Sequence, residues 1–127
     1  MKLWIDDVRP APNGYLWCKS VNEAIYTIET VEKYTANFHN KEFQLFVERK
    51  YSASKDFAKN AAYTRIELID IDHDAGDYAS EGGDYIRILD WLEKTGRNYP
   101  IRIHSMNPVG VVNMRRIIER NGWTEVK

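Results

Sequence analysis

The sequence predicts an α/β fold in which a doubly wound parallel sheet of about five strands alternates with helices. Three observations predict it: apolar runs alternate with helical patterns, the clearest run is apolar at nearly every position, and three runs end in polar clusters. The clusters are Asp6-Asp7, Asp72-His73-Asp74 and His104-Ser105. Because the carboxyl ends of parallel strands share one edge of a sheet, where ligands bind, we expect the three clusters to meet.

The N-terminal part is expected to hold two strands and a helix. A strand over 2–5 ends at the Asp-Asp pair, and two prolines and an Asn-Gly pair keep the loop that follows irregular. A second strand spans 15–19. Ser20 and Glu23 form a capping box that opens a helix ending near Lys33, with its apolar residues on one face.

Residues 34–65 form a variable insertion that mixes aromatic, charged and small polar residues. Within it, the run over 44–49 has the pattern of a strand, and 54–63 has that of a short helix. Any special contact with a substrate or partner is expected there.

The C-terminal half alternates strands with helices. In chain order we predict a strand over 65–72, a helix over 84–94, a strand over 101–104, a helix from Pro108 to Gly122 and a last strand over 123–126. The first of these strands is rich in isoleucine and is expected at the centre of the sheet. Asn107 suits the N-cap of the last helix, with Pro108 at its first position.

The composition predicts one domain over residues 1–127. A net charge of -1 argues against binding of long nucleic acids, but it leaves room for a small anionic ligand. No run approaches the ~18 apolar residues that a membrane span requires. Cys18 is the only cysteine, and the first residues lack the pattern of a signal peptide, so we expect a cytoplasmic protein without a disulfide.

Asp6, Asp7 and Asp72 are the candidate ligands for a divalent cation, Mg²⁺ or Mn²⁺, which takes oxygen ligands from carboxylates. Solvated acids at a strand end are the alternative for the Asp-Asp pair alone, but a second acidic cluster on the same edge favours an ion. Asp70 shares a strand face with Asp72 and lies deeper, where its carboxylate needs a hydrogen-bonding partner.

His73 and His104 are the candidates for proton transfer, with Asp74 as an orienting carboxylate. A lone histidine is more often structural, but two imidazoles facing one crevice beside acids permit acid and base roles. Ser105 and Asn107 lie where the last helix begins, and the N–H groups and dipole there favour an anion. We expect both to bind phosphate, and helix capping is the alternative role of Asn107.

Three stretches taken together resemble a known family. They read LWIDDVRPAP near the start, IDHDAG in the middle, and IHSMNPVG followed by NMRR. The set resembles the cyclic-phosphate processing receiver domain family, a divergent branch of the response-regulator receivers, over residues 1–33 and 66–122. The resemblance implies a receiver-like (flavodoxin-like) sheet of five strands with a divalent cation at its carboxyl edge. It assigns the family's acid pair to Asp6 and Asp7, its receiver-type aspartate to Asp72, and its other polar residues to His73, Asp74, His104 and Ser105.

The leading functional hypothesis is a metal-dependent phosphoesterase that acts on cyclic phosphates, either 2′,3′-cyclic phosphate ends of RNA or cyclic nucleotides. One alternative is a receiver-like signalling module without enzymatic activity, in which Asp72 accepts a phosphoryl group and a protein partner or a homodimer passes the signal. The other is sequestration of a cyclic nucleotide without cleavage. An ordinary receiver has a lysine at the end of its last strand to bind the phosphoryl group, and the Glu125-Val126-Lys127 ending matches that poorly, which argues against plain phosphotransfer.

Overall fold

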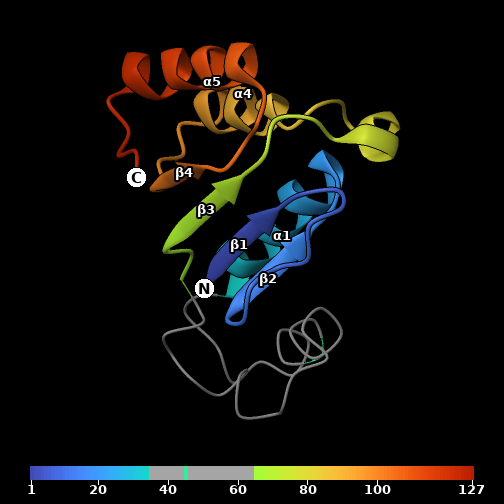
Figure 1. The fold of residues 1–127 in the computed structure, drawn as a ribbon. Helices are drawn as coiled ribbons and strands as arrows, with labels where there is room; N and C mark the ends of the chain where they lie inside the picture. The colour runs from blue at the N-terminus through green and yellow to red at the C-terminus, as the bar shows by residue number, and fades with distance from the viewer. Residues whose placement is uncertain (35–44, 46–64) are drawn as a thin grey trace.

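The centre of the structure, a computed structural model that describes residues 1–34, Leu45 and 65–127, is an all-parallel sheet. The described strands lie in the order β2-β1-β3-β4 (Figure 1). They are β1 (Lys2–Ile5), β2 (Tyr15–Cys18), β3 (Leu68–Ile71) and β4 (Ile101–Ile103). The predicted α/β class is confirmed, and β3 is a fully buried inner strand as expected. The strand and helix predicted within 34–65 lie outside the described residues.

The described helices are α1 (Val21–Tyr34), a 3-10 helix η2 (Gly76–Ser80), α4 (Ile86–Lys94) and α5 (Pro108–Asn121). Two of them, α1 and α5, begin at the capping residues that the sequence indicates. The Ser20 hydroxyl accepts a hydrogen bond from the Glu23 N–H at 3.0 Å, which fixes the start of α1. Helix α5 begins after Asn107 as predicted, and it ends where Gly122 adopts a left-handed conformation.

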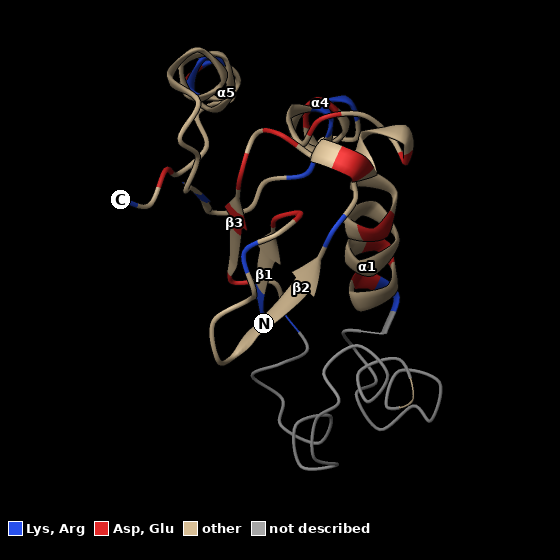
Figure 2. Cartoon of the chain, turned by 45° about the vertical axis from the view of Figure 1, so that its right-hand side comes forward, with Lys and Arg blue, Asp and Glu red and all other residues tan. Residues whose placement is uncertain are grey.

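The α-helices of the described residues form one layer on one face of the sheet. Helix α1 contacts α4, and α4 contacts α5; Figure 2 shows α1 and α4 on the same side of the strands. The crossovers from β2 to β3, from β3 to β4 and from β4 to Glu125 lead in one direction across the sheet. Right-handed crossovers of that kind place their helices on one side.

The opposite face of the sheet has no helix from the described residues. The connection from β1 to β2 leads the other way across the sheet, but it is a loop over 6–14 that contains two prolines. Within the part of the chain that the structure describes, the α-helices therefore cover one face, and the doubly wound arrangement with helices on both faces stays a prediction. The loop over 6–14 adds no helix to the second face, because its two prolines interrupt helical hydrogen bonding.

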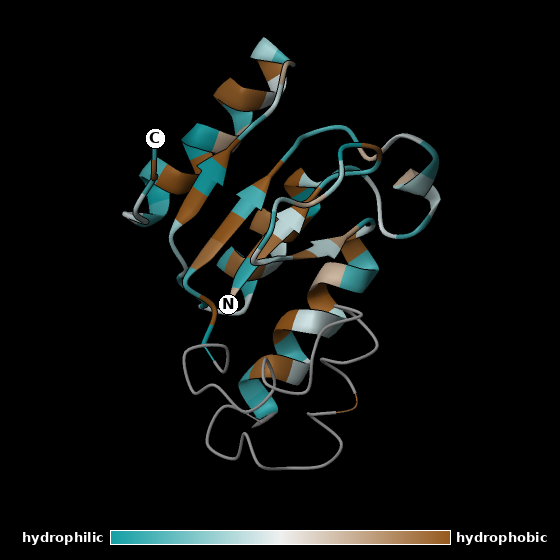
Figure 3. Ribbon diagram, turned by 60° about the horizontal axis from the view of Figure 1, so that its bottom comes forward, coloured by the Kyte–Doolittle hydropathy of each residue, from teal (hydrophilic) through white to brown (hydrophobic). Residues whose placement is uncertain are grey.

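The two faces of the sheet differ in character. The face under the helices carries fully buried side chains that form the core, among them Leu3, Ile5, Leu16, Ile69 and Ile101. The alternating positions point to the other face, where those of β1 and β2 are exposed or only partly buried, for example Trp4 and Trp17, whereas Asp70 of β3 is buried. Figure 3 shows hydrophobic and hydrophilic residues alternating along the strands.

The fifth strand predicted over 123–126 is reduced to a single parallel bridge between Ile101 and Glu125. The Ile101 N–H donates to the Thr124 carbonyl at 3.0 Å, and the Val126 N–H donates to the Ile101 carbonyl at 2.8 Å. A longer ladder does not form because β4 spans only three residues and offers a short partner. The count of about five strands is therefore corrected to four among the described residues.

Among residues 1–34, Leu45 and 65–127, no helix combines the length and the apolar character needed to cross a membrane.

Candidate functional site

The carboxyl ends of β1, β3 and β4 bring the three polar clusters together at one edge of the sheet. The hydrogen-bond ladder continues past the strands, because the Asp72 N–H donates to the Ile5 carbonyl and the His104 N–H to the Ile71 carbonyl, both at 2.9 Å. As a result, one carboxylate oxygen from each of Asp6, Asp7 and Asp72 lies within 4.8 Å of the other two. Residues far apart in the sequence thus meet as the strand pattern predicts.

Asp6 is a buried carboxylate whose two oxygens are both fully engaged. Oδ1 accepts the N–H groups of Val8 at 3.0 Å and Arg9 at 2.8 Å, while Oδ2 contacts Arg9 Nε and His104 Nε2, each at 3.0 Å. Burial by itself would raise the pKa of Asp6. The backbone hydrogen bonds, the His104 bond and the charge of Arg9 outweigh burial and hold that pKa below its ordinary value. Asp6 is therefore a fixed anion that organises the loop after β1.

Asp7 and Asp72 are the carboxylates of the cluster with capacity left for a ligand. Burial, followed by the negative charges of Asp6 and Asp72, raises the pKa of Asp7. The Asp7 carboxylate packs against Gly76, and a Cβ at that position would overlap it. Gly76 also has a φ of +54°, a left-handed conformation that favours glycine. Asp72 Oδ1 accepts the His73 N–H at 2.8 Å. Asp7 and Asp72 thus keep carboxylate oxygens available at the cluster.

Arg9 is the site residue that the sequence reasoning missed. Its Nε lies 3.0 Å from Asp6 Oδ2, and its Nη2 donates to the His104 carbonyl at 2.9 Å and lies 3.3 Å from Asp72 Oδ2. Burial would lower the pKa of Arg9, but Asp6 and Asp72 raise it. The sequence feature that could have indicated this role is the position of Arg9, three residues after Asp6 in a proline-containing loop. A turn of that length brings the side chain back over the strand end.

His104 lies between two carboxylates and against an indole. Its Nδ1 is 2.6 Å from Asp70 Oδ1 and its Nε2 is 3.0 Å from Asp6 Oδ2. The imidazole also stacks on Trp4, with ring centroids 3.8 Å apart and an angle of 3° between the planes. Both carboxylates can accept a hydrogen bond only from an imidazole with a proton on each nitrogen. Asp70, expected to need a partner, finds it in His104.

His73 has a free ring nitrogen. Its Nδ1 lies 2.8 Å from Asp74 Oδ1, and Asn107 Nδ2 lies 3.4 Å from the same nitrogen. No hydrogen-bond partner for its Nε2 exists in the part of the chain that the structure describes. The ring packs on Gly110 of α5, where a Cβ would overlap it. The predicted His73-Asp74 pair is thus in contact, and Nε2 is the nitrogen left to exchange a proton.

Ser105 and Asn107 make local bonds at the start of α5. The Ser105 hydroxyl accepts the Asn107 N–H at 3.1 Å, and Asn107 Oδ1 caps the helix by accepting the Gly110 N–H at 3.0 Å. The capping role weighed for Asn107 is therefore observed. Phosphate binding by these two residues stays a prediction, which rests on their place beside the helix N-terminus.

The acidic cluster fits a hard divalent cation. Asp6, Asp7 and Asp72 offer carboxylate oxygens close enough to surround one ion, and oxygen ligands are those that Mg²⁺ and Mn²⁺ prefer. Asp6 has little coordinating capacity left, so Asp7 and Asp72 are the main candidates for direct contact. A cation there would also offset the negative charges of Asp6 and Asp72, which, after burial, raise the pKa of Asp7.

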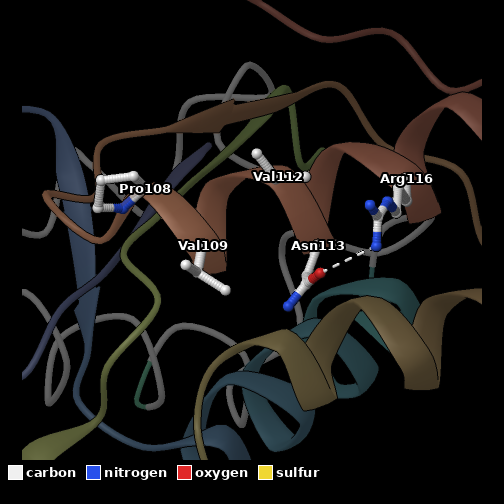
Figure 4. Close-up of a pocket in the computed structure, with 5 residues that line it drawn as sticks. All are labelled: Pro108, Val109, Val112, Asn113 and Arg116. Atoms are coloured by element: carbon white, nitrogen blue, oxygen red, sulfur yellow. Dashed lines mark hydrogen bonds between the residues drawn. The ribbon is translucent and has the colours of Figure 1, made fainter.

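A separate hollow lies on the outer side of α5 (Figure 4). It is lined by Pro108, Val109, Val112, Asn113 and Arg116. Within it, Arg116 Nη1 donates a 3.5 Å hydrogen bond to Asn113 Oδ1. Because it contains neither the carboxylates nor the imidazoles, the chemistry of the described residues is concentrated at the sheet edge.

Comparison with known sequences agrees with this geometry. A family model described as a cyclic-phosphate processing receiver domain matches residues 1–120, which confirms the resemblance noted in the sequence. The parallel sheet and the α-helices α1, α4 and α5 of the described residues are consistent with a receiver-like fold. No curated protein and no solved structure matches the chain.

Proposed function

The chain belongs to the cyclic-phosphate processing receiver domain family, and from that premise we propose that it is a metal-dependent phosphoesterase. The observation that supports this most is that three carboxylates able to hold an ion meet the His73-Asp74 pair at one sheet edge. A divalent cation and a proton carrier beside one phosphate are the parts that metal-assisted ester hydrolysis uses. The proposed substrates are 2′,3′-cyclic phosphate ends of RNA or cyclic nucleotides.

The cation would be held by Asp7 and Asp72, with Asp6 fixing the loop from which Asp7 extends. When bound there, Mg²⁺ or Mn²⁺ supplies positive charge that draws electron density from the phosphoryl oxygens. Arg9 and the N-terminus of α5, with Ser105 and Asn107, lie beside the cluster and favour a negatively charged group.

His73 is the proposed proton carrier. In the tautomer with its proton on Nδ1, that nitrogen donates to Asp74 and Nε2 can accept a proton. In the proposed step a water oxygen bonds to phosphorus and its proton passes to His73 Nε2. The bond from phosphorus to one ribose oxygen breaks, and that oxygen takes up the proton. One water is consumed and a phosphate monoester is formed.

His104 is proposed to position the site rather than to carry protons. Both of its ring nitrogens already face carboxylates, and its ring is held against Trp4. It therefore keeps the Asp6 carboxylate oriented. The sequence predicts proton transfer at both histidines, and the geometry favours His73 for that role.

The test is turnover of 2′,3′-cyclic AMP in Mg²⁺ or Mn²⁺, with and without EDTA. We expect turnover only with the cation, and we expect His73→Ala to lose about 10²–10⁴-fold in rate, the usual contribution of a general acid or base. Asp72→Asn should remove activity as well, whereas Asp90→Asn, an exposed acid on α4, should leave it unchanged. Full rate in His73→Ala would remove the proposed proton carrier.

A second candidate function is a signalling module, and the position of Asp72 favours it. Asp72 lies just past the end of the inner strand β3, beside the other acids, as a phosphoacceptor would. Incubation with acetyl phosphate and Mg²⁺, followed by intact mass measurement, would reveal a phosphoryl group on the protein, and Asp72→Asn would prevent it. Sequestration differs from both, because the cyclic nucleotide would then bind tightly and be recovered intact.

A further inference from the structure

We infer that Arg9 binds the phosphate group of the ligand and shares Asp72 with the divalent cation. This inference rests on the proposed function, because it concerns the same edge of the sheet. It assigns a specific side chain to the recognition of the anion, which neither the acids nor the imidazoles provide. Three features of the guanidinium support this role: its fixed edge, its open edge and its contact with Asp72.

The anchored side of Arg9 is held by two firm contacts. Nε pairs with the buried Asp6 carboxylate at 3.0 Å, and Nη2 donates to the His104 carbonyl at 2.9 Å. The Arg9 backbone is held too, because its N–H donates to Asp6 Oδ1 and its carbonyl accepts the Trp4 indole N–H at 2.8 Å. The guanidinium is therefore preorganised, and little side-chain freedom is lost when a ligand binds.

The opposite side of the guanidinium is open. Nη1 has no partner within residues 1–34, Leu45 and 65–127, and the Arg9 side chain is 45% exposed. A guanidinium with one edge fixed and two N–H groups open is suited to a phosphate, since its planar fork matches two phosphate oxygens. An arginine whose sole task was to neutralise Asp6 would not need this open edge.

The contact with Asp72 couples the anion to the cation. Nη2 lies 3.3 Å from Asp72 Oδ2, longer than the bonds to Asp6 and to His104, so this is the contact that gives way most easily. A divalent cation on Asp72 and the permanently charged Arg9 repel each other. A phosphate lying between them attracts both, so cation and phosphate are expected to increase each other's affinity.

The experiment is isothermal titration with Mn²⁺ alone, and then with inorganic phosphate and 2′,3′-cyclic AMP in the presence and absence of Mn²⁺. The variants are Arg9→Gln and Arg9→Lys, and Arg102→Gln is the matched control. Arg102 also faces a buried acid, with Nη1 4.0 Å from Asp70 Oδ2 and a side chain 49% exposed, but it does not reach the acidic cluster. Thermal denaturation accompanies each variant.

We expect Arg9→Gln to bind Mn²⁺ alone about 3-fold or more tightly than the wild type, because a like charge is removed. We expect it to bind both phosphates about 10–100-fold more weakly in Mn²⁺, the usual effect of losing charge-assisted hydrogen bonds. Arg9→Lys keeps the charge beside Asp6 but loses the planar fork, so its phosphate affinity should fall in between. Arg102→Gln should match the wild type throughout.

Unchanged phosphate affinity in Arg9→Gln would overturn the inference, even if the ester is still hydrolysed. Should Arg9→Gln fail to fold, Arg9→Lys decides, and wild-type phosphate affinity in that variant has the same force. The proposed function fails differently: wild-type protein would then bind the cyclic phosphate with the cation but never hydrolyse it, while the loss of binding in the Arg9 variants would still hold.

Discussion

His104 Nδ1 lies 2.6 Å from Oδ1 of Asp70, so an imidazole at the end of β4 meets the carboxylate inside β3. Asp70 is 1% exposed, and a carboxylate so placed needs a charged or hydrogen-bonding partner. In the pairing register, Asp70 lies between Trp4 of β1 and Arg102 of β4. A residue inside β3 thus holds the imidazole that contacts Asp6 at the edge of the sheet.

The first prediction concerns this pair. Asp70→Asn removes the negative charge that faces His104 and keeps the size of the side chain, so we expect a loss of about 1–3 kcal/mol in the free energy of unfolding. His104→Gln should also destabilise the protein, and the double variant should lose less than the sum of the single losses, because the two residues interact. Urea unfolding measures all three.

The control for the pair is Asp90→Asn, whose side chain is 47% exposed and which should change stability by less than about 0.5 kcal/mol. Additive losses in the double variant would contradict a direct interaction between Asp70 and His104.

The second prediction is a dependence of stability on pH that comes from Asp6. Its pKa in the folded protein is lowered, so its contribution to stability is present above its ordinary pKa of about 4 and is lost as the pH falls through the folded value. The difference in unfolding free energy between the wild type and Asp6→Asn should therefore be constant from about pH 5 to 8 and should shrink below about pH 4. Urea unfolding at a series of pH values measures it, and a difference that grows on acidification would refute the assignment.

The third prediction is that Asp7→Asn stabilises the protein in EDTA. The raised pKa of Asp7 means that its charge opposes folding at neutral pH, so neutralising it should add on the order of 1 kcal/mol, a few degrees in Tm. The wild type should gain about 2.7 kcal/mol in Mn²⁺ at a hundred times its Kd, and Asp7→Asn should gain far less.

Asp77→Asn, an exposed acid in η2, is the control for Asp7 and should behave as the wild type in both conditions. An equal gain from Mn²⁺ in Asp7→Asn and in the wild type would show that the ion binds elsewhere.

The fourth prediction concerns the packing of His73 on Gly110. Alanine favours helices over glycine by about 1 kcal/mol, but a Cβ at Gly110 would overlap the His73 ring. We therefore expect Gly110→Ala to lose about 1–3 kcal/mol in stability or to displace the ring. Nitrogen chemical shifts of the histidines, together with urea unfolding, distinguish the two results.

Val109→Ala, on the exposed side of the same turn, is the control and should leave the His73 signals in place. Unshifted His73 signals with improved stability in Gly110→Ala would contradict the contact.

Much of the fold followed from local patterns in the sequence. Apolar runs ending in acids placed β1 and β3, and Asn107 with Pro108 placed the start of α5 correctly. The meeting of the three clusters could also be predicted, because it follows from parallel pairing alone. These features depend on periodicity and capping, which short stretches of sequence carry.

What could not be predicted depends on distant contacts. The roles of the two histidines differ because His104 meets Asp70, 34 residues away in sequence, whereas His73 meets its neighbour Asp74. In the sequence Arg9 is one residue of a proline-containing loop, and its role depends on contacts with Asp6 and Asp72 that form only when the loop folds back. The single helical layer follows from strand order, which local patterns do not reveal.

The stacked contact between Trp4 and His104 couples the fluorescence of that tryptophan to the site. The emission of an indole depends on the groups that contact its ring, and the His104 imidazole covers one face of Trp4. Because Asp6 holds the same imidazole, any rearrangement of that carboxylate changes the brightness of Trp4. With phenylalanine at Trp17, Trp91 and Trp123, the remaining indole would serve as a label-free fluorescent probe of the acidic edge.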